Sequence, residues 1–231
     1  MDIQLYFEEK GSGTPFIFLH GNGEDGTYFK NQTDYFQRKY RVIAVDTRGH
    51  GKSPRGEKPF TIKQFSCDLY DFMTERDIVS AIILGFSDGA NIAMTFAMEH
   101  PEMVKALILN GGNLNPEGIK RSTQIPIELG YKIAKRFAKK SQGAKKNAEM
   151  LGLMVNEPNI EPTELSKITA PTLVICGTSD MVKDAHTKEI AGSIKNAKLT
   201  LIKGNHFIAS KRPEEFNRAV DEFLSEITDL R

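Results

Sequence analysis

Residues 81–98 read AIILGFSDGANIAMTFAM, a strand-like run followed by a helix-like one. Its first six residues form a short apolar run, typical of a parallel strand that is covered on both faces. The residues that follow Ser87 are rich in apolar and small side chains and predict a buried helix. Gly85 and Gly89 flank Ser87. Small residues in these places allow a sharp, strained turn that lifts the serine hydroxyl out of the sheet.

Similar strand-like runs alternate with helical ones along most of the chain. The other continuous apolar runs lie at 15–20, 41–46, 105–110, 172–177 and 198–203, and the alternating run 3–9 predicts an edge strand. Helices are expected at 28–39, 61–75, 88–99 and 183–194, and a last one begins at Pro213. This alternation predicts an α/β protein with a doubly wound, mostly parallel sheet, in which functional groups gather at the carboxyl ends of the strands.

Residues 113–165 interrupt the alternation because they contain no obvious strand. Within them, residues 127–140 are amphipathic. One face carries Ile127, Tyr131, Ala134, Phe137 and Ala138, and the other carries Lys132, Lys135, Arg136 and Lys139. We predict that residues 113–165 are a small helical lid inserted between two parts of one core, 1–112 and 166–231, and that its apolar face roofs the pocket.

The inserted segment is also the basic part of the chain. Residues 113–150 hold nine Lys and Arg against three Glu, whereas the whole chain has a net charge of only +1. A run of charge most simply forms a solvated face. The alternatives are attraction of an anionic substrate, or contact with an anionic partner or a lipid surface.

Composition excludes several classes of protein. The chain has 231 residues, 39% of them hydrophobic and 26% charged, which is an ordinary globular balance. The net charge of +1 gives no global field for binding nucleic acid. No apolar run approaches the ~18 residues of a membrane-spanning helix, so stable membrane insertion is not expected. The acidic start MDIQLYFEEK is not typical of a signal peptide, and two cysteines form no disulfide framework, so we expect a cytoplasmic location.

Two further strand ends carry side chains that could activate Ser87. Asp180 follows the run 172–177, and His206 follows the run 198–203. A serine hydroxyl is a poor nucleophile unless a base takes its proton and an acid orients that base. Asp184 competes with Asp180 for the acid. The histidines that compete for the base are His20, His50, His100 and His186, but only His206 follows the last strand.

The order Ser, Asp, His matches the triad of the α/β-hydrolases, and the chain resembles single-domain serine esterases and lactonases of that superfamily. The motifs that carry the resemblance are LHGNG, VDTRGHGKS, GFSDGA, PTLVICGTSD and GNHF. The resemblance implies a catalytic triad of Ser87, Asp180 and His206. It also implies an oxyanion hole formed by the backbone N–H groups of Asn22 and Asp88. No cofactor or metal is expected.

The loop GNGEDG, residues 21–26, permits a second interpretation. It has the G-x-G-x-x-G spacing of a dinucleotide-binding turn, and Asp46 follows Gly26 by twenty residues. However, Glu24 and Asp25 would place two carboxylates where a pyrophosphate must dock, at a helix N-terminus that attracts anions. This interpretation also gives no role to the triad, so we assign the loop to the oxyanion hole.

The function predicted from the sequence is hydrolysis of a small carboxylic ester through an acyl-serine intermediate. A lactonase of the same fold remains an alternative. So does a hydrolase of amino-acid esters, if the carboxylate of Asp88 holds a cationic group rather than packing at the helix start. An alternative from another class is a ligand receptor or partner-binding module with little turnover. The expected ligand is a small ester or lactone, and the oligomeric state is left open.

Overall fold

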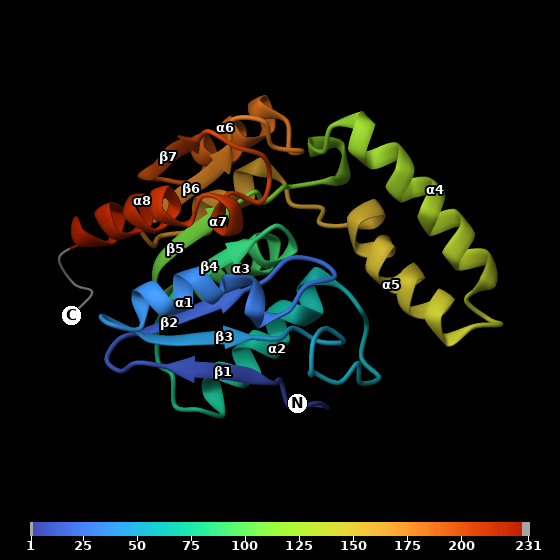
Figure 1. Ribbon diagram of the computed structural model, residues 1–231, viewed down its shortest axis with the longest axis horizontal. Coiled ribbons are helices and arrows are strands. Elements are labelled where there is room, and N and C mark those ends of the chain that lie inside the picture. The colour runs from blue at the N-terminus through green and yellow to red at the C-terminus, as the bar shows by residue number, and fades with distance from the viewer. Residues whose placement is uncertain (1, 228–231) are drawn as a thin grey trace.

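Seven strands form one sheet in the computed structural model, which describes residues 2–227 (Figure 1). Their order across the sheet is β1-β3-β2-β4-β5-β6-β7. The strands are β1 Phe7–Lys10, β2 Pro15–Leu19, β3 Arg41–Val45, β4 Ala81–Phe86, β5 Val104–Asn110, β6 Thr172–Gly177 and β7 Ala197–Ile202. Only β1 runs antiparallel to its neighbour. The predicted α/β class with a mostly parallel sheet is therefore confirmed.

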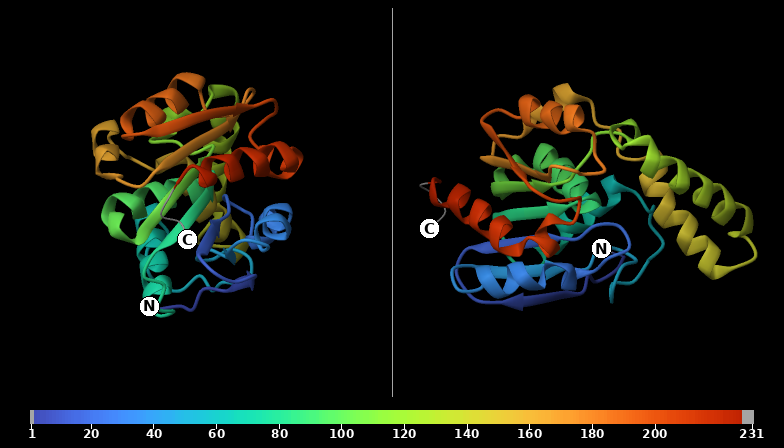
Figure 2. Two further views of the ribbon diagram at one scale, coloured as in Figure 1. Left: turned by 90° about the vertical axis from the view of Figure 1, so that its left-hand side faces the viewer. Right: turned by 45° about the horizontal axis from the view of Figure 1, so that its top comes forward.

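Helices cover both faces of the sheet, as Figure 2 shows. The helices are α1 Lys30–Phe36, α2 Ile62–Thr74, α3 Asp88–Glu99, α4 Arg121–Phe137, α5 Gln142–Asn156, α6 Asp184–Ser193, α7 Ile208–Lys211 and α8 Pro213–Ser225. Side chains of α2, α3 and α6 belong to one apolar cluster, and side chains of α1, α7 and α8 belong to the other. The sheet is thus doubly wound, as the sequence predicted.

Strand β2 shows why the strand sequences are continuously apolar. Phe16 and Phe18 point into one cluster, while Ile17 and Leu19 point into the other, and all four are buried. Successive side chains of a strand alternate between the faces of a sheet, so a strand covered on both faces needs apolar residues at every position. The sheet is therefore held from both sides, and the loops at its carboxyl edge start from a rigid base.

Some elements differ from the expectation. The edge strand β1 begins at Phe7 rather than at residue 3. The helix expected over 127–140 begins earlier, at Arg121, and a second helix, α5, follows it. Helices α4 and α5 lie side by side as a hairpin, which projects beyond the carboxyl ends of the strands (Figures 1 and 2). No helix within residues 2–227 has both the length and the apolar character that crossing a membrane requires.

The hairpin packs differently from the lid that the sequence predicted. A Cβ on Gly130 would lie 3.3 Å from Leu151 Cδ1, and a Cβ on Gly152 would lie 3.3 Å from the ring of Tyr131. The face of α4 that carries Tyr131 and Ala134 therefore rests on α5 and not on a pocket. Phe137, which was assigned to this face, is 49% exposed. The apolar face was expected to roof the pocket, and that expectation is wrong because α5 occupies the position.

Candidate active site

Ser87 occupies a strained turn between β4 and α3. Its backbone has φ of +53° and ψ of −119°, a conformation that side chains other than glycine rarely adopt. The two flanking positions must be glycine, because the surrounding backbone leaves no room for a side chain there. A Cβ on Gly85 would lie 2.2 Å from the carbonyl oxygen of Gly89, and one on Gly89 would lie 2.0 Å from that of Leu19. The surrounding backbone therefore fixes the turn and the position of the serine.

The second group consists of Asp180 and His206, which follow β6 and β7. His206 Nδ1 donates to Asp180 Oδ1 over 2.7 Å, and both side chains are almost fully buried. Burial opposes ionisation of Asp180, but the hydrogen bonds from His206 and from the Val182 N–H outweigh it and lower the pKa of this carboxyl. An ionised Asp180 fixes the ring of His206 with Nδ1 protonated and leaves Nε2 as the basic nitrogen.

The ring of His206 packs beside the turn that holds Ser87. The His206 ring lies 4.8 Å from the ring of Phe86, the residue before the serine. A Cβ on Gly111 would lie 2.7 Å from His206 Cε1, so only glycine leaves room for the ring here. Within residues 2–227, Nε2 is buried and has no hydrogen-bond partner. The structure thus forms the Asp180–His206 contact and leaves the proton-accepting nitrogen free.

The loop after β2, which includes Gly21 and Asn22, lies beside the serine turn. A Cβ on Gly21 would lie 3.1 Å from Ser87 Cβ, so the loop passes directly beside the serine. A turn holds its shape: the N–H of Glu24 donates to the carbonyl of Gly21, and the N–H of Gly21 donates to Glu24 Oε2. Within residues 2–227, the backbone N–H groups of Asn22 and Asp88 donate to no backbone carbonyl outside the regular helices and strands. All five residues predicted for the site therefore lie in one region.

The carboxylate of Asp88 is engaged by amide groups. Asn22 Nδ2 donates to its Oδ2 over 3.0 Å, and Asn91 Nδ2 donates to its Oδ1 over 3.3 Å. The residue is 8% exposed, and burial raises the pKa of this carboxyl to about 6 despite the amide donors. This arrangement matches the interpretation in which Asp88 packs at the start of the helix.

Asn22 connects the loop after β2 to the hairpin. The same Nδ2 group that donates to Asp88 also donates to the carbonyl oxygen of Met150, in α5, over 2.7 Å. A second link joins Arg55 to Glu149 through two hydrogen bonds of 2.8 and 3.0 Å. Neither link could be predicted from the sequence, because each joins residues far apart in the chain and no local pattern indicates it.

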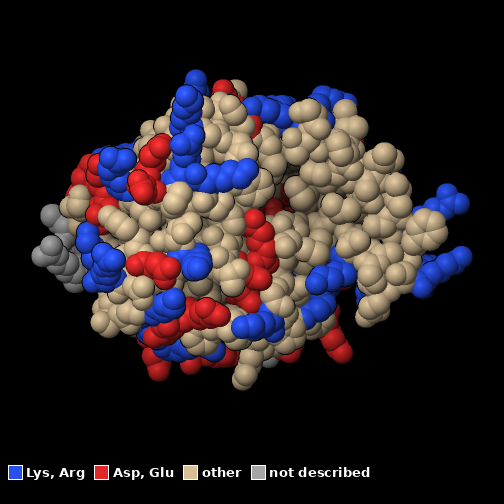
Figure 3. Space-filling model, in the orientation of Figure 1, with Lys and Arg blue, Asp and Glu red and all other residues tan. Residues whose placement is uncertain are grey.

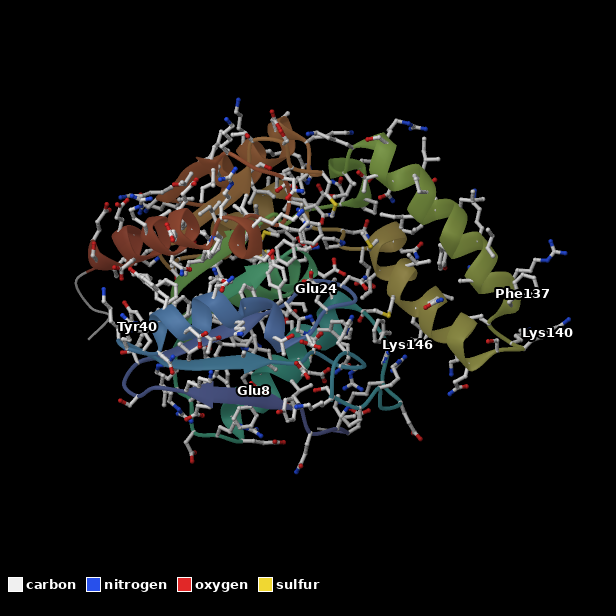
Figure 4. All side chains as sticks on the ribbon, in the orientation of Figure 1. Glu8, Glu24, Tyr40, Phe137, Lys140 and Lys146 are labelled. Carbon is white, nitrogen blue, oxygen red and sulfur yellow. The ribbon has the colours of Figure 1, made fainter. Side chains whose placement is uncertain are left out.

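Glu24 is a functional candidate that the sequence did not single out. Burial raises the pKa of its carboxyl to about 7, and it interacts electrostatically with His206. Figure 4 labels Glu24 on the body next to the hairpin, where Figure 3 shows acidic surface. The only sequence signal was the pair of acids inside GNGEDG.

His20, His50 and Asp46, which the sequence also offered as candidates, hold loops in place. His20 Nδ1 donates to the carbonyl of Gly21, and its Nε2 accepts from the N–H of Thr47. Burial lowers the pKa of His20 and of His50 to about 4, so both rings are neutral. Asp46 accepts from the N–H groups of Gly26 and Lys52 at 2.7 and 2.8 Å. Asp46 thus ties two loops together and is not free to hold a ribose.

The residues just before α4 contact the loop that holds Asp180. Lys120, just before α4, donates from Nζ to the carbonyl oxygen of Asp180 over 2.6 Å, and its backbone N–H donates to the carbonyl of Met181. Ile119 and Val182 form an isolated antiparallel bridge beside it. The hairpin is therefore attached both to the loop of Asp180 and, through Asn22, to the loop after β2.

Comparisons with known proteins agree with this geometry. A family model described as alpha/beta hydrolase fold matches residues 14–128. The chain is 26% identical to 3-oxoadipate enol-lactonase 2 of Acinetobacter baylyi, over 96% of this chain and 94% of that protein. It is also 26% identical to the serine hydrolase BPHL of Homo sapiens, over 96% of this chain and 83% of that protein.

A solved structure gives the same fold. The enol-lactonase from Burkholderia xenovorans LB400 superposes with a TM-score of 0.81 at 20% identity and covers 96% of this chain and 97% of that one. The family match, the sheet order and relatives spanning nearly the whole length place the chain in the α/β-hydrolase fold superfamily. It is an enzyme of the hydrolase class.

Proposed function

We propose that the chain is a serine hydrolase that cleaves a small carboxylic ester through an acyl-serine intermediate. The observation that carries the proposal is the buried 2.7 Å hydrogen bond from His206 to Asp180, together with the free Nε2 beside the strained turn of Ser87. An orienting acid, a free base and a hydroxyl at strand ends are the parts that nucleophilic catalysis requires. In this proposal, the hydrogen bond between Nε2 and the Ser87 hydroxyl forms when substrate binds.

The first half of the reaction transfers the acyl group. Nε2 of His206 takes the proton of Ser87 while Oγ bonds to the ester carbonyl carbon, and the carbonyl oxygen becomes negative. The backbone N–H groups of Asn22 and Asp88 stabilise that oxygen, and one such donor is commonly worth about 3 kcal/mol. The ester C–O bond then breaks, and the alcohol leaves with the proton held by His206. Asp180 stabilises the imidazolium throughout.

The second half releases the acid. Water attacks the acyl-serine, His206 takes the water proton, and the same two N–H groups stabilise the new oxyanion. Collapse returns the proton to Ser87 and frees the carboxylic acid. In this proposal the insertion 113–165 limits access to the site as a lid, and its role is supported by the bonds from α5 to Asn22 and from Lys120 to the loop of Asp180.

A lactone is the second candidate substrate. It is supported by the two enol-lactonases among the similar proteins, one of them matching in sequence over nearly the full length of both chains. A lactone is a cyclic ester, so the same residues would act, and the alcohol would stay attached to the released acid. The small ester or lactone is the only ligand that the mechanism needs.

We also propose a cytoplasmic location. Both cysteines are free thiols, with Cys67 exposed and Cys176 buried in β6. Burial raises the pKa of Cys176 to about 11, so this thiol is protonated and inert. An exposed free thiol suits a reducing compartment.

The test is hydrolysis of a p-nitrophenyl ester series, from acetate to decanoate, alongside a set of simple lactones. We expect wild type to turn over one of these sets and Ser87→Ala to lose activity at least ~1,000-fold, because no other group supplies the nucleophile. Ser122→Ala, which alters an exposed serine in α4, is the control and should match wild type. Full activity in Ser87→Ala would disprove the proposed nucleophile. Inactivity of wild type on both sets would favour the ligand-receptor alternative.

A further inference from the structure

Helix α4 exposes a row of large apolar side chains on the side away from α5. Ile125, Leu129, Ile133 and Phe137 are 52%, 59%, 54% and 49% exposed, respectively. We call these four residues the α4 stripe. They recur every four residues and so lie one above the other along the helix, over about 18 Å. Exposed apolar residues are ordinary when scattered, but a continuous row marks a binding surface.

The stripe is not the face that holds the hairpin together. The opposite side of α4, with the half-buried Tyr131 and the buried Ala134, already packs against α5. The stripe is therefore the apolar part of α4 that α5 does not cover.

Basic side chains border the stripe. Lys132 and Arg136 follow Leu129 and Ile133 by three residues, so each lies beside the row, and both are exposed. Lys140 lies at the outer end of the hairpin with Phe137, as Figure 4 shows. The only acid in α4 is Glu128, and it is half-buried. Figure 3 shows a largely uncharged hairpin surface with basic groups at its outer end.

We propose that the α4 stripe docks the protein reversibly on an anionic lipid surface. An exposed apolar row bordered by Lys and Arg on one helix is the pattern of a helix that lies in a membrane interface. The charge distribution fits the same partner: residues 113–150 hold nine Lys and Arg against three Glu, so the basic charge of the chain is concentrated where the stripe lies. Anionic lipids attract such segments within a Debye length.

The arrangement of charge also disfavours a second copy as the occupant. A two-fold contact brings the same patch of both copies together. Lys132 and Arg136 of one copy would then approach the like charges of the other, whereas an anionic surface neutralises them. The hairpin also projects beyond the body, so the stripe can reach a flat surface without obstruction by the rest of the molecule (Figures 1 and 2).

The first test is sedimentation of the wild-type protein with vesicles of phosphatidylcholine alone and of phosphatidylcholine with phosphatidylglycerol at 3:1. We expect binding to the anionic vesicles that weakens as salt is raised, and little binding to the neutral ones. The variant Leu129→Ser/Ile133→Ser should lower the partition coefficient at least ~tenfold, because it removes apolar area that the lipid would otherwise bury. Val79→Ser is the matched control: it removes an 82% exposed apolar side chain outside the hairpin and should bind like wild type.

The second test reverses charge beside the stripe. Lys132→Glu/Arg136→Glu should lower the partition coefficient by at least ~25-fold, at about fivefold for each basic residue near the surface. Lys188→Glu/Lys195→Glu changes the net charge equally at exposed positions on the body and should have a much smaller effect. Turnover of a soluble p-nitrophenyl ester should be unchanged in all these variants, which shows that they fold.

Three results would overturn the proposal. The wild type could fail to sediment with either vesicle, or it could bind both equally, which would remove the role of charge. Alternatively, light scattering could reveal a dimer that Leu129→Ser/Ile133→Ser abolishes, and the occupant would then be a second copy. None of these results depends on whether Ser87 is the nucleophile.

Discussion

The serine turn and the hairpin are built in opposite ways. At the turn, added Cβ atoms on Gly85 and Gly89 would lie 2.2 and 2.0 Å from backbone oxygens, so neither of these two positions has room for a side chain. In the hairpin, a Cβ on Gly143 would meet nothing closer than 3.8 Å. Backbone from several elements crosses at the turn, whereas the hairpin meets the body through polar links and the buried side chain of Leu153.

This difference separates the chemistry from the control of access. The groups proposed to react are fixed by strands buried on both faces. The hairpin is held by Asn22, by Lys120, by the Arg55–Glu149 pair and by Leu153. A region held by few contacts can move or change in sequence at little cost to the core. We therefore expect changes near the sheet to abolish activity and changes in the hairpin to alter which molecules are bound.

Asp180→Asn should produce the largest effect. An amide can present its N–H to His206 Nδ1 and reverse the tautomer, and it cannot stabilise the imidazolium, so kcat should fall about 10⁴-fold, as at the equivalent acid of serine proteases. Asp184→Asn, four residues further on at the exposed start of α6, is the control and should retain full activity. Equal loss in the two variants would disprove the assignment of the acid.

Gly89→Ala and Gly143→Ala compare the two regions directly through one substitution. The first places a methyl group 2.0 Å from the Leu19 carbonyl oxygen and should cost about 4 kcal/mol or more of the free energy of unfolding. The second has room in the first turn of α5 and should stabilise by up to about 1 kcal/mol. Urea unfolding measures both. Similar costs for the two would mean that the turn is less constrained than its geometry indicates.

Asp88→Asn should change the dependence of stability on pH. Burial raises the pKa of Asp88 from 3.8 to about 6 in the folded state. Between these values the folded protein keeps a proton that the unfolded chain has released, so the free energy of unfolding falls as pH rises from about 4 to 6. The loss amounts to about 3 kcal/mol, and the amide variant should not show it. Parallel stability curves for the two proteins would contradict the buried carboxyl.

Asn22→Ala should give the smallest of these effects and should act on the hairpin. The backbone N–H proposed for the oxyanion remains, but the links to Asp88 and Met150 are lost, at a cost of about 1 to 2 kcal/mol for the unpaired buried groups. Amide exchange in α5 should accelerate. Gln37→Ala is the control because its amide donates to the carbonyl of Asp34, outside the hairpin. Unchanged exchange in Asn22→Ala would show that the link does not hold the hairpin.

The parts that could be predicted from the sequence are those that local patterns encode. Continuous apolar runs reveal strands covered on both faces, and parallel strands gather their carboxyl ends at one edge. That is why Ser87, Asp180 and His206 could be placed near one another without coordinates. The glycines around Ser87 could be interpreted for the same reason, since the turn itself demands them.

The parts that could not be predicted depend on contacts between distant residues. The side chain of Arg48 is fully buried and pairs with Asp68 and Asp2, whereas an arginine in a loop is normally expected to be exposed. Helix α5 was missed because its first half, QGAKKNA, has almost no apolar periodicity. Phe137 was placed on the wrong side of α4 because the position of α5 determines which side is covered.

Reaction with a fluorophosphonate probe, followed by mass spectrometry of the protein, tests whether Ser87 is the nucleophile. We expect a single adduct on the peptide that contains Ser87, lost in Ser87→Ala and formed much more slowly in His206→Ala. An adduct at another residue, or ester turnover by a protein that the probe does not label, would contradict the proposal that Ser87 is the nucleophile.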